Sequence, residues 1–212
     1  DVDDTPVRIY MSLARVYHAT GDYLAAKEVW LRCCKEPYTA TATSWLGVAL
    51  ASDRIPGSLD ETRLALIQAN RLDKTNAQVW GQLALNCFRR AQQDKYPTSA
   101  NRTLELAQTS LSYALKFGLR DADTLYELGL CYQRSENYEL AEELFRRSLF
   151  QQESSETRIH FAQIMLAQNR HADALHQYRA ALSRSSADES LDPGTARRIG
   201  QRINELVSIL GQ

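Results

Sequence analysis

Few side chains of this 212-residue sequence are spaced in a way that could support metal chemistry. Its four histidines are His18, His160, His171 and His176, and Glu156 lies four residues before His160. On a helix this spacing would present a carboxylate and an imidazole on one face, as two ligands of a metal ion. A metal site needs at least one more ligand, and none lies nearby in the sequence. We therefore interpret Glu156 and His160 as an ordinary surface pair, and predict neither a metal nor a cofactor.

Motifs of catalysis and phosphate binding are absent from the sequence. It contains no G-x-x-x-x-G-K-[ST], G-x-G-x-x-G, G-x-S-x-G or H-E-x-x-H. The run Glu142-Glu143 followed by Arg146-Arg147 has the i, i+4 spacing of salt bridges on an exposed helix face. We predict no catalytic residue and no enzyme activity.

The four cysteines do not form a disulfide framework. Cys33 and Cys34 are adjacent, and no C-x-x-C spacing exists with Cys87 or Cys131. Cysteines without such spacing are typical of proteins in a reducing compartment. We interpret them as small core-filling residues.

Composition excludes some classes of partner. The formal net charge is −1 and the isoelectric point is about 6.5, so no global field favours nucleic acid or an anionic membrane. No apolar run approaches the roughly 18 residues of a membrane helix. The chain opens at Asp1 without methionine, and we expect it to be a segment of a longer protein.

A pattern of large and small residues recurs five times, and it specifies helical hairpins. A small residue stands at the same place in each first half: Ala14, Gly47, Ala84, Gly129 and Ala162. Small residues also recur in each second half: Ala26, Thr62, Ala107, Ala141 and Ala174. Small residues opposite large ones let two antiparallel helices approach closely. The pattern resembles the tetratricopeptide (TPR) repeat, a helix-turn-helix of about 34 residues. The resemblance implies an all-α fold, a right-handed TPR solenoid of five helix-turn-helix repeats plus a C-terminal capping helix.

The repeat spacing divides the chain as one array over residues 1–212. The predicted repeats lie near 7–39, 40–76, 77–121, 122–154 and 155–188, and the capping helix at 193–210. An insertion at 53–58 lengthens the turn of the second repeat. A longer insertion at 92–102 forms either a loop or two lengthened helices. Its flanks favour helix, which indicates that the two helices are lengthened. Lengthened helices would form a ridge at the middle of the array, and this ridge is a second candidate docking surface. Ser58 has capping-box spacing before the next helix, and Gly118 is a helix stop.

The first helix of each hairpin lines the concave groove of a TPR stack, so its exposed positions are the candidate binding residues. They are Arg8, Met11, Arg15, Phe88, Arg89, Tyr126, Leu130, Arg134 and Gln163, and the same projection adds further positions, among them His18, Gln78, Gln133 and Glu156. Aromatic anchors mixed with arginines suit an extended or helical peptide that carries acidic residues. The alternative is that these side chains only solvate an unused face. The lysines and asparagines of a chaperone carboxylate clamp are replaced by Met11, Arg15, Trp45, Gln78 and Gln82, so we predict no such clamp.

Three stretches carry a narrower resemblance. Residues 44–49 (SWLGVA), 68–73 (QANRLD) and 76–85 (NAQVWGQLAL) resemble a TPR segment of the cilia- and flagella-associated protein 70 family. The resemblance implies a non-catalytic scaffold or adaptor with protein partners in the axoneme of motile cilia, and it transfers no functional residue. Two alternatives stay open. One is a recruitment module of another cytosolic assembly, in transport or ubiquitin-ligase machinery, with a cytoplasmic location. The other is an RNA-binding helical repeat, which near-neutral charge and the lack of a recurring base-reading pair disfavour.

Overall fold

The computed structural model describes residues 5–35, 40–188 and 191–211 of the chain, and these ranges are helical throughout apart from turns. They contain no strand, which confirms the prediction of an all-α fold. The helices are α1 (Thr5–Ala19), α2 (Tyr23–Cys33), α3 (Ala42–Asp53), α4 (Leu59–Leu72), α5 (Ala77–Gln93), α6 (Pro97–Lys116), α7 (Ala122–Arg134), α8 (Tyr138–Gln151), α9 (Ser155–Ala167), α10 (His171–Asp188) and α11 (Pro193–Leu210).

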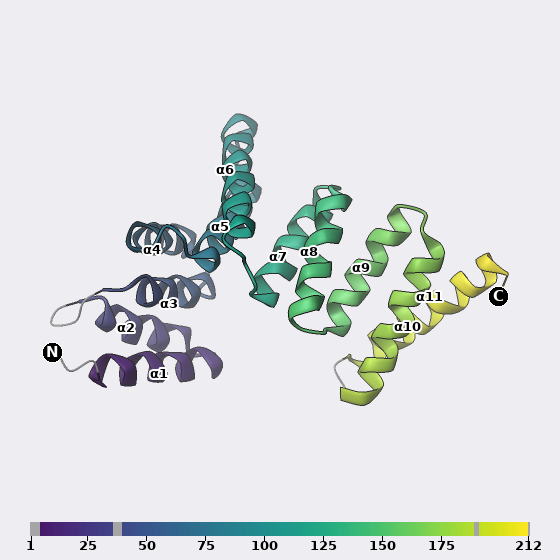
Figure 1. Cartoon of the computed structure of the whole chain (residues 1–212), viewed down its shortest axis with the longest axis horizontal. Coiled ribbons are helices and arrows are strands. Elements are labelled where there is room, and N and C mark those ends of the chain that lie inside the picture. Colours follow the sequence, from purple (N-terminus) through teal and green to yellow (C-terminus); the bar gives the residue numbers. More distant parts are fainter. Residues whose placement is uncertain (1–4, 36–39, 189–190, 212) are drawn as a thin grey trace. The chain divides into compact units, whose positions relative to one another are not determined.

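The helices pack as consecutive hairpins in two compact units (Figure 1). Unit 1 spans Asp1–Leu119 and unit 2 spans Arg120–Gln212. In unit 1 the hairpins are α1/α2, α3/α4 and α5/α6, and in unit 2 they are α7/α8 and α9/α10, with α11 packed on α10. Within each unit, the first helices of successive hairpins also touch, α1 with α3 and α7 with α9. These first helices therefore share one face of their unit.

The small residues of the repeated pattern lie where the helices approach. Ala14, Ala84 and Ala162 are fully buried, as are Ala26 and Ala141 of the second halves. Gly129 on α7 leaves so little space that a β-carbon built on it would lie 2.6 Å from Cε1 of Phe145 on α8. Real β-carbons do not approach ring carbons so closely, so this helix crossing requires glycine.

Most helix ends are capped as their sequences indicate. Asp121 and Asp192 accept hydrogen bonds from the backbone N–H groups of Thr124 and Thr195. Gly118, with a φ of +81°, follows α6 in the left-handed conformation, as predicted for a helix stop. The capping prediction at Ser58 was wrong: its side chain makes no cap bond, and its carbonyl accepts from the Thr62 hydroxyl instead.

The long insertion lengthens the third hairpin rather than forming a loop. α5 has 17 residues and α6 has 20, against 12 and 14 in α3 and α4, and only Asp94–Tyr96 separate them. Figure 1 shows α6 standing out from the other helices of unit 1. The expected lengthening is confirmed. The shorter insertion is the turn between Asp53 and Leu59.

The charged run on α8 pairs with itself as predicted. Arg146 contacts Glu142 at 2.6 Å and Arg147 contacts Glu143 at 2.6 Å. The four cysteine thiols are free, with Cys33 and Cys131 buried and the other two half-buried. Among the described helices, none has the length and apolarity to cross a membrane.

Candidate functional site

A pocket of about 320 Å³ opens on the shared face of the first helices in unit 1. Three helices, α1, α3 and α5, supply most of its lining, and α2 supplies one aromatic residue. The lining residues are Arg15, His18, Ala19, Trp30, Thr43, Leu46, Gly47, Leu50 and Gln78. Arg15, His18 and Gln78 are positions that the sequence predicts to line a groove, and the structure brings them to one pocket.

The lining of this pocket is mainly apolar. Trp30 and Leu46 are 5% and 6% exposed, so they belong to the core and present only part of their surface to the pocket. Trp30 lies against Gly47, whose missing side chain leaves room for the indole. Trp30, Leu46, Gly47 and Leu50 belong to the repeated packing pattern, and their place beside the groove follows only from the packing of α2 against α3.

The polar groups of the pocket are few. Arg15 is exposed, and the described lining residues include no lysine, aspartate or glutamate beside it. His18 packs its ring edge-on against Tyr23, with 5.2 Å between ring centroids. The His18 Nε2 is buried and has no hydrogen-bond partner in the described part of the chain. An unpaired buried nitrogen is uncommon in folded proteins, and a bound ligand is one way to satisfy it.

Unit 2 presents a different first-helix face, in which the polar side chains bond to one another. The Gln133 amide on α7 donates to Oε1 of Gln163 on α9 at 3.2 Å, and its own oxygen lies 3.2 Å from Nδ1 of His160. Tyr126 meets the His160 ring edge-on at 5.8 Å. Gln163 and Tyr126 are predicted groove residues, whereas their neighbour His160 was not predicted to be one.

Tyr126, Gln133, His160 and Gln163 form a cluster on this face. Burial has the largest effect on the pKa values of its two titratable groups. Burial lowers the pKa of His160 below its usual value, with a smaller opposing effect of Glu156. Burial also raises the pKa of Tyr126, and a hydrogen bond with Glu156 raises it further. Glu156 is exposed and His160 is half-buried, and both contribute to this cluster at the surface of unit 2. No group of three potential metal ligands occurs among the described residues.

The remaining candidate residues are not equally available to a partner. Phe88 is only 6% exposed, which corrects its prediction as a groove contact: it packs in the core. Arg89 forms an ion pair with Asp53 at the end of α3, so its charge is already neutralised. Arg8 and Arg134 are exposed, whereas Met11 packs partly against the core of unit 1 and Leu130 is half-buried.

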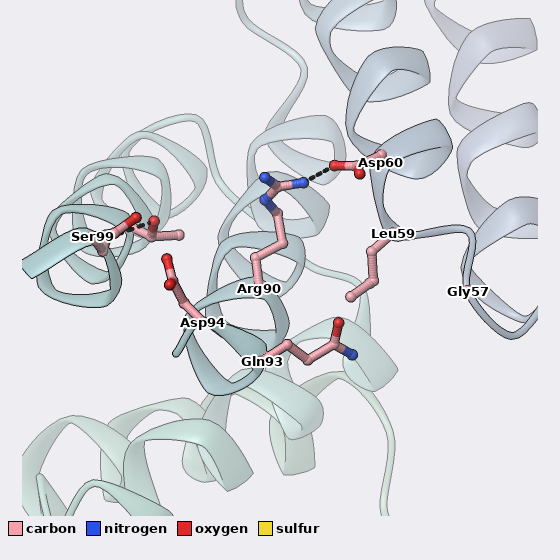
Figure 2. A pocket seen from close by; sticks show the side chains of 8 residues that line it. Gly57, Leu59, Asp60, Arg90, Gln93, Asp94 and Ser99 are labelled. Carbon is pink, nitrogen blue, oxygen red and sulfur yellow. Dashed lines mark hydrogen bonds and ion pairs between the residues drawn. The ribbon is translucent and has the colours of Figure 1, made fainter. Parts of the chain in front are cut away.

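A second pocket, of about 330 Å³, lies beside the turn that joins α5 and α6, next to the start of α4 (Figure 2). Figure 2 shows Arg90 of α5 reaching across to its ion-pair partner Asp60 of α4. Asp94 and Ser99 line the opposite side, and their hydrogen bond lowers the pKa of Asp94. Because its arginine is paired within the protein, this polar pocket is less suited to capturing a charged ligand. The pair joins residues 30 positions apart, so the sequence carried no signal for it.

The family model and the curated relatives that match this chain point to the same family. The model of the cilia and flagella-associated protein 70 C-terminal domain, a TPR family, matches residues 2–197. Cilia- and flagella-associated protein 70 of Homo sapiens and of Macaca fascicularis are each 32% identical over 120 residues, which is 57% of this chain. The matched segment spans about a tenth of the length of those relatives.

Solved structures agree on the fold. A thermophilic TPR protein of Thermus thermophilus superposes with a TM-score of 0.71 at 20% identity, over 92% of this chain and 98% of that one. MamA of Desulfovibrio magneticus gives a TM-score of 0.61 at 14% identity, over 86% of this chain and 97% of that one. A TPR protein of Parabacteroides merdae gives 0.58 at 17% identity, over 96% and 73%. These neighbours confirm the predicted TPR fold, and the family match covers most of the sequence. The chain belongs to the family of C-terminal TPR domains of cilia- and flagella-associated protein 70.

Proposed function

We propose that this chain is a non-catalytic scaffold that binds protein partners in the axoneme of motile cilia. TPR hairpins typically serve protein–protein interaction, because stacked helices build an extended surface from few residues per repeat. The observation that carries the proposal is the family match over residues 2–197, together with an apolar pocket on the first-helix face. The names of the curated relatives support the ciliary location.

The division of the chain is part of the same proposal. Five repeats near 7–39, 40–76, 77–121, 122–154 and 155–188 build the binding surface. The helix at 193–210 shields its C-terminal end, as solenoid caps do. In α11, Ile199 and Leu206 are buried against the rest of unit 2, while Arg197, Arg198 and Arg202 are exposed. This polar outer side supports the capping role.

The proposed binding residues are the groove candidates whose side chains are exposed to a partner. Arg8 and Arg15 in unit 1, and Arg134 and Gln163 in unit 2, are exposed on first helices and can contact a partner without unfolding the core. In unit 2, Tyr126 adds an aromatic side chain on the same helix as Arg134. Arginine and aromatic side chains contribute most per residue at protein interfaces.

Proximity labelling tests this function. The chain, fused to a promiscuous biotin ligase, is expressed in a motile-ciliated cell and compared with the ligase alone. We expect axonemal proteins to be enriched and the fusion to locate to the cilium. Enrichment of a soluble cytosolic complex, without ciliary proteins, would discard the axonemal role. Enrichment of RNA-binding proteins together with RNA would contradict a protein scaffold.

A further inference from the structure

We propose that the pocket between α1, α3 and α5 binds a peptide segment in which one large apolar side chain is flanked by acidic residues. This inference rests on the proposed function and specifies the chemistry of the partner. The occupant is a segment of a separate protein partner, because a scaffold acts by holding other chains.

The size and lining of the pocket fit a single side chain. Its volume of about 320 Å³ is at the lower limit of ligand pockets and is sufficient for one large apolar side chain. Trp30, Leu46 and Leu50 offer an aromatic and two aliphatic surfaces. Burying a leucine or phenylalanine side chain against such surfaces is favourable by the hydrophobic effect.

The charge around the pocket selects the residues beside that anchor. Arg15 lines the pocket, and Arg8 lies seven residues earlier, on the same side of α1, and is exposed. α1 contains no aspartate or glutamate, so neither arginine has a carboxylate on its own helix. An acidic segment would therefore meet two cations along α1, and each carboxylate could accept paired hydrogen bonds from a guanidinium.

A comparison with Arg89 shows that the charge of Arg15 is available to a partner. Both arginines belong to first helices of unit 1. Arg89 is engaged by Asp53, whereas no ion pair engages Arg15 within the described ranges. Arg15 is therefore available to a carboxylate from outside at the edge of the apolar pocket, as is Arg8 seven residues earlier on α1.

Neutral polar groups complete the site. Thr43 and Gln78 lie on the pocket lining and can hydrogen-bond the backbone of a bound segment. The buried His18 Nε2 lacks a partner among the described residues. A rotation of the imidazole on binding would let a backbone group supply that partner and recover the cost of the unpaired nitrogen.

The test is fluorescence anisotropy with the full 212-residue chain and a labelled peptide. The probe is Gly-Ser-Glu-Glu-Phe-Glu-Glu-Ser-Gly, and two control peptides replace Phe by Ser or all Glu by Lys. We expect the probe to bind, with affinity that falls as salt is added. Both control peptides should bind at least about tenfold more weakly, because each removes one of the two recognised features.

Two variants place the binding in the pocket. Thr43→Trp fills the pocket from an exposed position on α3, and Arg15→Glu reverses the charge at the edge of the pocket. Each variant should bind the probe with an affinity at least about tenfold lower than that of the wild type. The matched control Arg63→Glu makes the same charge change at an exposed position on α4 outside the pocket and should have little effect. Circular dichroism and thermal melting confirm that each variant folds.

Three results of the peptide-binding assay would overturn the proposal: no binding of the probe, equal binding of the control peptides, or wild-type binding by both pocket variants. None of these contradicts the scaffold function. That function is judged by the labelling experiment, in which Thr43→Trp can be run in parallel. If Thr43→Trp enriches the same ciliary proteins as the wild type, the scaffold stands and the pocket proposal fails.

Discussion

The backbone of Gly47 on α3 lies directly against the indole of Trp30 on α2. A β-carbon built on Gly47 would overlap the ring carbons Cδ2 and Cε2 of Trp30. The two residues join the first hairpin to the second, and they also form part of the pocket described above. Core packing and the candidate binding site therefore share one contact.

Gly47→Ala is expected to destabilise the protein although alanine is the better helix former. Overpacking against Trp30 destabilises the fold by about 1–3 kcal/mol, whereas the higher helix propensity of alanine stabilises it by only about 1 kcal/mol. We expect a net loss of up to about 2 kcal/mol in the free energy of unfolding of unit 1. Urea denaturation followed by circular dichroism measures it.

Gly200→Ala is the matched control. Gly200 lies within α11, and a β-carbon built there meets nothing within 4 Å. The same chemical change should therefore stabilise unit 2 slightly, by about 0.5–1 kcal/mol. If Gly47→Ala behaves like Gly200→Ala, then the close contact with Trp30 does not limit this helix crossing.

Removing one partner of the Arg89–Asp53 pair should destabilise unit 1. The side chains of Arg89 and Asp53 are 29% and 11% exposed. Arg89→Met leaves the half-buried carboxylate unpaired, and partial solvent screening limits the loss to about 1–2 kcal/mol. Thermal unfolding measures the effect, and adding Asp53→Asn to Arg89→Met should recover part of it. A loss that Asp53→Asn does not reduce would assign the role of Arg89 to packing rather than charge.

Stability should fall in alkaline solution through Tyr132 on α7. Burial raises its pKa from 10 to about 12. Between these values the unfolded chain loses the phenolic proton while the folded chain keeps it, so rising pH favours unfolding. The contribution is fully present below pH 10 and is lost progressively toward pH 12, by up to about 3 kcal/mol.

Tyr132→Phe removes the titrating group while keeping the ring. Chemical denaturation at a series of alkaline pH values should show a shallower loss of stability in Tyr132→Phe than in the wild type. Tyrosinate absorbance of the folded wild type should show a group that titrates late. Parallel stability curves for the two proteins would mean that the Tyr132 phenol does not control the alkaline transition.

The sequence by itself determined the helices and how closely they could pack. Small residues such as Ala14 and Ala162 recur at a fixed place because a helix crossing tolerates no larger side chain there. This requirement leaves a periodic pattern that can be recognised in the sequence. The lengthening of α5 and α6 was predictable for a related reason: their flanks are rich in helix-forming residues, so helix propensity favours continuation over a loop.

Tertiary structure alone decided which predicted surface residues are available. Phe88 and Arg89 are neighbours at groove-type positions, yet Phe88 is buried and Arg89 is paired with Asp53, 36 residues away. Burial and charge pairing depend on where other helices lie, and no local pattern encodes this. The same reason applies to the pocket, since Arg15 and Gln78 line it together only after α1, α3 and α5 have packed.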